Sequence, residues 1–381
     1  MRERLRHAIM VSLDALKRPA RSAESIETIA LLVGAAALAS GFGVSMILFW
    51  GEQLTISGRG SIGAHAAVGG AIVTVVAFAL GRAAVRPRAG ARGARDEFTG
   101  PTDRLRWYDL IAIAGAYASV ALLGWSGVAQ LLELSFIGAP VFAFPGSVLV
   151  GVALGLTAYV AFLGSARLTP LSLSMDLAVF LVVGAFAAML TSSDPRWWQN
   201  NLSALGMTSN AAAPAFNVTL VIAGIIVTTI ARFATAALPV ALPAQRRGRT
   251  VMRTGLVLVG LFLAAVGVFP VDRFFALHNT VATGMVVVYG VMICALPWLL
   301  PTLPRVFFAL GYAYVAVIAL LAMFFVTGYY NLTAVELIAA VLIFSWIIVF
   351  LRTTATVTAR DDGPEIAAPS VAGDRSPTLS S

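Results

Sequence analysis

Apolar residues along the chain gather in runs of about 20, and shorter segments with turn residues and charges separate these runs. A helix of that length crosses the hydrocarbon core of a bilayer, which is about 30 Å thick. The pattern therefore predicts an all-α protein, a polytopic bundle of about ten transmembrane helices. We place the spans at 26–50, 62–85, 109–132, 143–164, 170–191, 213–236, 251–270, 277–298, 306–328 and 332–351.

The distribution of charge along these spans predicts their orientation. If the spans alternate in direction, all basic residues except Arg59, Arg196 and Arg273 fall on the same side of the membrane as the N-terminus. Basic residues concentrate on the cytoplasmic side of membrane proteins, so both termini are expected in the cytoplasm. Sorting of charge across a membrane also accounts for the net charge of +8 without a nucleic-acid partner. The richness in Arg, Ala and Gly favours a bacterial plasma membrane.

The spans divide the chain into four regions. Residues 1–25 form a basic cytoplasmic segment, either an interfacial anchor on anionic lipid or an ordinary topogenic tail. Residues 26–164 form a four-span region that includes a flexible cytoplasmic loop at 86–106. Residues 170–351 form a six-span region, and residues 352–381 are expected to be a disordered cytoplasmic tail.

Small residues at four-residue spacing predict where the first spans pack closely. Inside lipid, helices associate through close contact between backbones rather than through exclusion of water. The predicted packing faces consist of Ala37, Gly41 and Ser45, then Ala66, Gly70 and Thr74, and finally Gly151 and Gly155.

Two ionisable residues lie within the predicted spans at similar depth on consecutive helices. Asp176 is about two turns into the fifth span, and Arg232 is about one turn before the end of the sixth. We predict that they form an ion pair, which serves either as a gate or as a structural clasp. The alternative for Arg232 is that its side chain extends to the membrane surface.

The loop after the fifth span, residues 192–206, has the features of a short helix lying flat on the outer surface. Ser193 or Asp194 can cap such a helix, Pro195 suits its first turn, and Gly206 suits its end. Trp197 and Trp198 are typical of residues that anchor a segment at the membrane interface. This orientation turns polar side chains, including Ser203, toward a cavity.

Polar side chains gather at the predicted outer ends of the fifth to eighth spans and form the candidate site. The candidate binding residues are Asn201, Ser203, Asn217, Asp272 and His278. A catalytic alternative uses His278 and Asp272 for proton transfer, with His65 contributed by the other half of the chain.

Motifs for metal, cofactor and nucleotide chemistry are not found in the sequence. The spacing of histidines and carboxylates matches no metal motif, so neither a metal nor a cofactor is expected. The chain has one cysteine, Cys294, and lacks GxSxG, HExxH and P-loop motifs.

The outer loops contain the short motifs Asn201-Leu-Ser203-Ala204-Leu205-Gly206, Phe216-Asn217 and Gly267-Val-Phe-Pro270, followed by Asp272 and His278. Together these motifs resemble a bacterial membrane family known as domain of unknown function 998. The resemblance covers about residues 171–351. It implies a six-span architecture but no activity, and Ala204 stands where that family commonly has an acidic residue. The chain is also distantly similar to eukaryotic six-span proteins linked to lipid homeostasis.

Three functional hypotheses follow from these features. The leading one is a non-enzymatic protein that binds or handles a lipid or small amphiphile at an outward-facing polar pocket. The second is a membrane-embedded hydrolase or transferase, and the third is an accessory subunit of a membrane complex. The sequence leaves the oligomeric state open.

Overall fold

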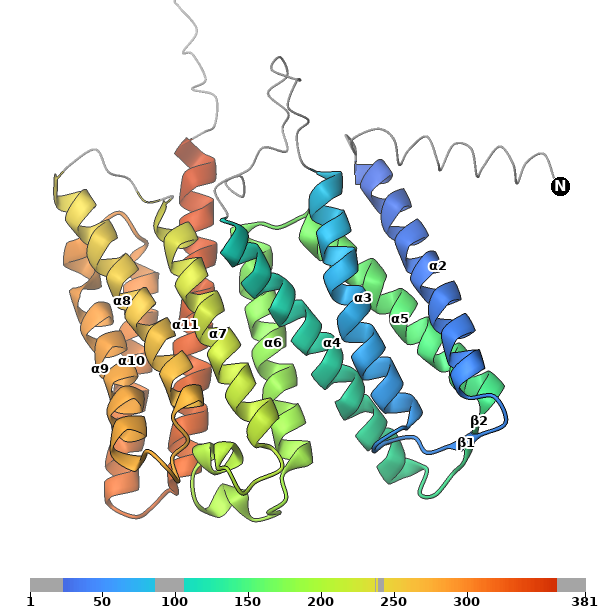
Figure 1. Cartoon of the computed structure of the whole chain (residues 1–381). Coiled ribbons are helices and arrows are strands. Elements are labelled where there is room, and N and C mark those ends of the chain that lie inside the picture. Colours follow the sequence, from blue (N-terminus) through green and yellow to red (C-terminus); the bar gives the residue numbers. More distant parts are fainter. Residues whose placement is uncertain (1–22, 86–105, 237, 239–242, 362–381) are drawn as a thin grey trace, which may run out of the picture.

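The computed structural model describes residues 23–85, 106–236, 238 and 243–361, and in these ranges the chain is a bundle of long helices (Figure 1). Ten helices in the described ranges are long and apolar enough to cross a membrane, as the sequence predicts. They are α2 (Ala23–Leu48), α3 (Ile62–Ala84), α4 (Trp107–Ser135), α5 (Ala143–Ala166), α6 (Pro170–Thr191), α7 (Ala213–Ala236), α8 (Pro243–Val268), α9 (Phe275–Leu299), α10 (Arg305–Val326) and α11 (Leu332–Asp361).

Short elements cover one end of this bundle. Strands β1 (Gln53–Leu54) and β2 (Val141–Phe142) pair antiparallel and link the loop after α2 to the loop before α5. The 3₁₀ helices η2 (Trp197–Gln199) and η3 (Leu202–Gly206) occupy the α6–α7 loop at the same end. We call this end of the bundle the ribbon end. It is the end that the charge distribution predicts to be outside the cell.

The first four helices pack through their small residues. Helices α2 and α3 both lie along α5, and α4 packs against α3. A Cβ added to Gly155 would lie 3.0 Å from the carbonyl oxygen of Gly34, so the backbones of α2 and α5 approach too closely for a side chain. All the small residues predicted to form packing faces in α2, α3 and α5 are buried, which confirms that prediction.

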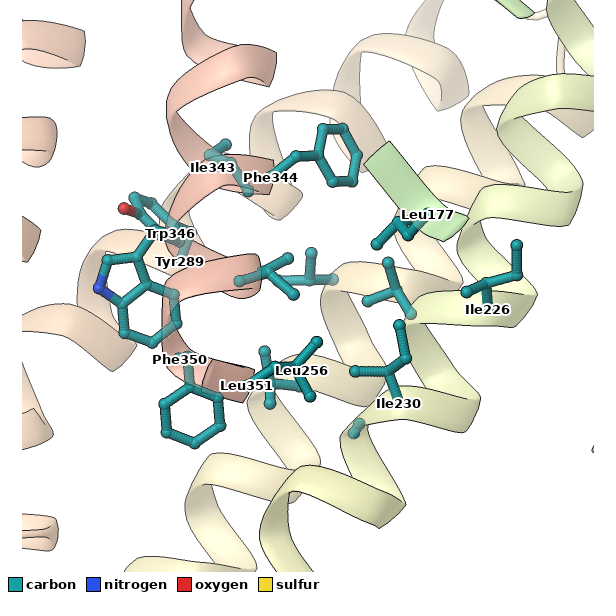
Figure 2. Packing of buried hydrophobic residues seen from close by; sticks show 14 of the residues in the cluster. Leu177, Ile226, Ile230, Leu256, Tyr289, Ile343, Phe344, Trp346, Phe350 and Leu351 are labelled. Atoms are coloured by element: carbon teal, nitrogen blue, oxygen red, sulfur yellow. The ribbon is translucent and has the colours of Figure 1, made fainter. Parts of the chain in front are cut away.

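The last six helices enclose a larger apolar core (Figure 2). Trp346 of α11 is fully buried at its centre, where it stacks on Phe307 of α10 and on Phe350 one turn along its own helix. Leu177 and Ile230 bring α6 and α7 into the same cluster. The cluster also takes in Ile113 of α4, so the two halves of the chain share this core.

The structure differs from the sequence expectations at several boundaries. Helix α11 continues to Asp361 instead of ending at 351, and α8 begins at Pro243, ahead of the apolar run that starts at 251. Backbone hydrogen bonding extends a helix beyond the apolar stretch that marks its membrane-spanning part. The predicted short helix at 192–206 is instead two separate 3₁₀ turns. Residues 1–22, 86–105 and 362–381, which include most of the predicted flexible segments, lie outside the described residues.

Candidate functional site

A histidine and a serine from distant parts of the sequence meet at the ribbon end. His278 lies in the first turn of α9, and its Nε2 is 3.0 Å from the Oγ of Ser203 in η3. The other ring nitrogen, Nδ1, is 2.7 Å from the carbonyl oxygen of Phe269. A carbonyl can only accept, so the hydrogen-bond network assigns the proton of the neutral ring to Nδ1. Nε2 is then the acceptor for the hydroxyl of Ser203.

The carboxylate of Glu336, in α11, binds backbone N–H groups at and just before Ser203. Glu336 accepts a hydrogen bond from the backbone N–H of Leu202 at 2.6 Å and another from the backbone N–H of Ser203. Two side-chain oxygens nearby, Oδ1 of Asn201 and Oγ1 of Thr333, are buried and have no hydrogen-bond partner in the described residues. The site therefore combines a serine, a histidine and a carboxylate with unused hydrogen-bonding capacity.

The other predicted binding residues hold the α6–α7 loop against the helices. The side-chain nitrogen of Asn217 donates to the carbonyl oxygen of Gly206 at 3.0 Å. Asp272 accepts hydrogen bonds from the backbone N–H of Thr208, at 3.1 Å, and from its hydroxyl. Asp272 is thus engaged by the loop, and the predicted pairing of Asp272 with His278 is replaced by contacts of His278 with Ser203 and Phe269.

Because Thr208 donates hydrogen bonds to Asp272, the stability of the α6–α7 loop depends on whether the Asp272 carboxyl is ionised. The hydroxyl of Thr208 lowers the pKa of the Asp272 carboxyl below its usual value. A carboxyl with a lowered pKa stabilises the folded form above its unfolded pKa, about 4, and this stabilisation is lost as the pH falls below that value. We expect Thr208→Val to flatten the pH dependence of α6–α7 loop protection between about pH 5 and 3, as measured by amide hydrogen exchange corrected for its intrinsic rate.

A comparable hydrogen-bonding residue in the same loop tests whether that effect is specific. Asn210 bridges Ser192, Ser193 and the carbonyl oxygen of Ala204 without contacting an ionisable group. Asn210→Ala should lower loop protection equally at every pH. A pH dependence of Thr208→Val that matches that of the wild type would contradict the role assigned to Asp272.

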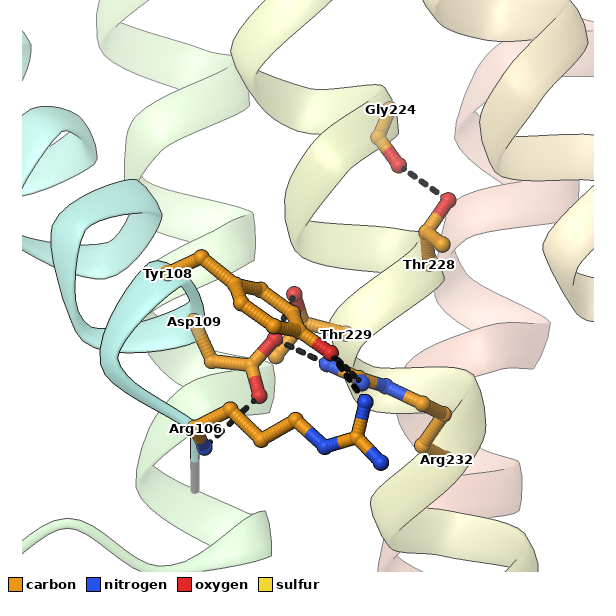
Figure 3. Close-up of polar contacts among 7 residues, drawn as sticks. All are labelled: Arg106, Tyr108, Asp109, Gly224, Thr228, Thr229 and Arg232. Atoms are coloured by element: carbon orange, nitrogen blue, oxygen red, sulfur yellow. Dashed lines mark hydrogen bonds and ion pairs between the residues drawn. The ribbon is translucent and has the colours of Figure 1, made fainter.

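An ion pair between α4 and α7, drawn in Figure 3, lies at the end of the bundle opposite the ribbon end (Figure 1). Arg232 pairs with Asp109, which is buried with only 3% of its side chain exposed, and also donates to the hydroxyl of Tyr108 at 2.8 Å. Asp109 in addition accepts hydrogen bonds from Thr229, at 3.3 Å, and from the backbone N–H of Arg106, at 3.0 Å. The carboxylate is therefore held by the N-terminus of α4 as well as by the arginine.

This geometry corrects the predicted pairing of Arg232 with Asp176. Asp176 of α6 faces the hydroxyl of Tyr117 on α4, and its oxygen Oδ2 is buried with no hydrogen-bond partner in the part of the chain that the structure describes. Helix α4 contacts both α6 and α7, so it supplies the partner for each of the two residues that were expected to pair with each other. Asp109 was missed because it lies at the start of its span, where carboxylates are common helix-capping residues.

The third candidate catalytic residue, His65, lies in a different part of the molecule. Helix α3 belongs to the first four helices and α9 to the last six, so His65 does not share a site with His278 (Figure 1). Its Nδ1 is 2.8 Å from the carbonyl oxygen of Ser61, and its ring meets that of Phe49 edge to face with centroids 4.9 Å apart. In the described ranges no group of three or more His, Cys, Asp or Glu side chains is placed to hold a metal ion.

His65 instead lines a groove between α2 and α3. The groove has a volume of about 540 Å³, and Val150 and Leu154 of α5 form its floor. Its walls are mostly apolar and are formed by Ser40, Gly41, Val44, Ser45 and Leu48 of α2 and by Ala64, His65, Val68, Gly69, Ile72 and Val73 of α3. Gly60, next to the exposed Arg59, completes the groove at the ribbon end.

A second, smaller depression lies along the first half of α8. Arg246, Arg249 and Arg253 line it together with Thr250 and Thr254, and its volume is about 390 Å³. The arginines follow one another at intervals of three and four residues, so they share one face of the helix. The polar lining suits an anion rather than an acyl chain.

Comparison with known families finds a match to part of the chain. Residues 177–353 match the family described as protein of unknown function (DUF998). This range contains the Ser203–His278 pair, Glu336 and the loop residues that surround them, whereas the groove between α2 and α3 lies outside it. The comparisons with curated proteins and with solved structures found no significant match.

Proposed function

We propose that this multi-pass membrane protein, whose residues 177–353 belong to the DUF998 family, binds a lipid or small amphiphile in the groove between α2 and α3. The observation that carries this proposal is a mostly apolar groove between two membrane-spanning helices, with His65 at its ribbon end. The protein would act in a bacterial plasma membrane with its ribbon end outward.

The shape of the groove suits an acyl chain. Helices α2 and α3 contact each other little because both pack on α5, so a channel runs between them along the direction of the spans. The side chains of Val68 and Ile72 are 54% and 60% exposed in the absence of lipid. Ligand sites of about 300 to 1,000 Å³ with mostly apolar walls are typical of small-molecule binding, and this groove lies within that range.

The polar end of the groove suits a headgroup. His65 and the backbone of Gly60 lie at the ribbon end, and the exposed Arg59 adjoins them. Arg59 is one of the few basic residues on this side of the protein, and a guanidinium recognises phosphate or carboxylate through paired hydrogen bonds. An amphiphile with an acyl chain and an anionic headgroup would fill both parts of the groove.

The polar residues at the outer ends of the later spans are less suited to this role. Asn217, Asp272 and Ser203 are already hydrogen-bonded to the α6–α7 loop or to His278. A ligand there would have to displace contacts within the protein, whereas the α2–α3 groove needs no rearrangement. This difference favours the groove as the binding site.

Native mass spectrometry of the gently extracted protein, with added phosphatidylglycerol, tests this proposal. We expect a stoichiometric lipid adduct that Val68→Trp and Ile72→Trp weaken by roughly tenfold, because an indole occupies the space of the acyl chain. Val76→Trp is the matched control, since Val76 is an exposed residue of α3 that does not line the groove.

Each outcome of this measurement bears on the proposal. Retention of lipid that is equal in all three variants would show that it binds elsewhere and would refute the assignment. A folded protein that retains no lipid would also refute it, and would favour the role of accessory subunit.

A further inference from the structure

We propose that Ser203 and His278 are a nucleophile and a general base for acyl transfer from an ester substrate. Both side chains are buried, with 8% and 3% exposed, and the 3.0 Å between Oγ and Nε2 is within the range of an activated serine. Both residues lie at the ribbon end, within the region that matches DUF998, and their proposed role does not depend on the groove between α2 and α3.

The base is oriented by a third group, as such a pair requires. The Nδ1–H of His278 donates a hydrogen bond to the carbonyl oxygen of Phe269, with 2.7 Å between the two heavy atoms. This bond fixes the ring so that the lone pair of Nε2 points at the hydroxyl of Ser203. In familiar hydrolases a carboxylate performs this orienting role, and here a backbone carbonyl performs it. Phe269 and Pro270 belong to the turn that ends α8, so the acceptor is fixed by the fold rather than by a mobile side chain.

The backbone beside Ser203 is built to bind negative charge. The N–H groups of Leu202 and Ser203 both point to the carboxylate of Glu336. A pair of backbone N–H groups that includes the N–H of the nucleophile is a common arrangement for stabilising the oxyanion of acyl transfer. In the present structure Glu336 occupies these donors, so its displacement by the substrate is part of the proposed cycle.

The reaction balances with an ester and water as the only reactants. Oγ of Ser203 attacks the ester carbonyl carbon while Nε2 of His278 takes the hydroxyl proton. The tetrahedral intermediate then breaks the bond to the alcohol oxygen, which receives that proton from His278. Water attacks the resulting acyl-serine in the same way, releasing the carboxylic acid and restoring the hydroxyl of Ser203.

The depth of the pair indicates the class of ester. His278 is in the first turn of α9 and Glu336 is in the second turn of α11, just inside the ribbon end of both spans. This is the level at which the hydrocarbon core of a bilayer gives way to its polar interface. The ester bonds of glycerolipids lie at that level, so an acyl ester of a membrane lipid is the expected substrate.

Covalent labelling of the full chain in lipid nanodiscs tests the proposal directly. A fluorophosphonate, which phosphonylates activated serine hydroxyls, should add one probe mass to the wild type, seen by intact-mass spectrometry and located at Ser203 by peptide mapping. Ser203→Ala should remove the label, and His278→Gln should slow labelling by roughly 100-fold or more because the general base is lost. Ser209→Ala, an exposed serine in the same loop, should label like the wild type.

Control measurements separate a lost nucleophile from a lost fold. Thermal unfolding of each variant identifies any that fail to fold. If Ser203→Ala does not fold, the probe position mapped in the wild type decides the question. A folded wild type that stays unlabelled, a label at any other serine, or an unchanged labelling rate in His278→Gln would overturn the proposal.

Discussion

Replacement of Arg232 by alanine is expected to destabilise the protein by roughly 3 to 5 kcal/mol. The carboxylate of Asp109 is 3% exposed, and without the guanidinium it would be a buried charge whose remaining partners are neutral hydrogen-bond donors. Removal of one partner from a buried pair typically costs this much because the other charge stays desolvated. The free energy of unfolding, measured by chemical denaturation in mixed micelles, should show the loss.

A double-mutant cycle identifies the unpaired charge as the cause. Asp109→Asn in the Arg232→Ala background removes the charge but keeps the shape, and it should recover part of the lost stability. Arg167→Ala is the matched control, because Arg167 pairs with Glu27 on the surface, where the two side chains are 48% and 39% exposed. An exposed pair contributes about 1 kcal/mol or less. Equal losses in Arg232→Ala and Arg167→Ala would contradict the buried role of Asp109.

The second large effect is expected where α7 and α8 cross. A Cβ on Gly224 would lie 2.7 Å from the backbone nitrogen of Ala264, and it would also collide with the carbonyl oxygen of Gly260. Backbone atoms cannot move aside as the end of a side chain can, so a larger residue must push the helices apart. We expect Gly224→Leu to cost about 3 kcal/mol or more, the upper range for overpacking, and to lower the yield of folded protein.

A glycine in open surroundings separates crowding from the effect of a larger side chain alone. Apart from its own turn of helix, Gly290 of α9 has no described atom within 4 Å of the position that a Cβ would occupy. Gly290→Leu should therefore leave stability unchanged or raise it slightly, since leucine favours a helix more than glycine does. If both substitutions destabilise the protein by the same amount, the close crossing of α7 and α8 is not the reason.

The sequence predicts the membrane bundle well because apolar length and small-residue spacing act locally. Each span must satisfy its own backbone hydrogen bonds in lipid, which leaves a helix as the solution for a long apolar run. The faces of α2, α3 and α5 follow in the same way from the four-residue spacing of Gly, Ala, Ser and Thr. The charge-based orientation of the termini stays a prediction.

Contacts between helices are less accessible from the sequence. Counting residues from the end of a span gives the depth of Asp176 and Arg232, but it does not tell which helix lies beside them. The spans are apolar around their whole circumference, so periodicity does not mark the neighbouring helix. The position of α4 between these residues decides both pairings, and only the assembled fold supplies it.

At the ribbon end, too, the sequence predicts which residues gather but not which of them contact each other. The sequence places Ser203, Asp272 and His278 at one end of the bundle, and the structure has all three there. It does not predict that His278 contacts Ser203 rather than Asp272, because the distance between them depends on how the α6–α7 loop folds back. Asn210, which holds that loop through several hydrogen bonds, has no sequence signal apart from its polarity.

The ion pair between α4 and α7 has a consequence for the order of events during synthesis. Arg232 lies 123 residues after Asp109, so at about 5 to 20 residues per second the arginine emerges from the ribosome roughly 6 to 25 s after the aspartate. During this interval Asp109 has only the backbone N–H of its own helix end and nearby water to balance its charge. Its place at the very start of α4, beside the membrane surface, lets α4 enter the bilayer without burying that charge. The ion pair between the two halves of the chain can then form once α7 has entered the bilayer.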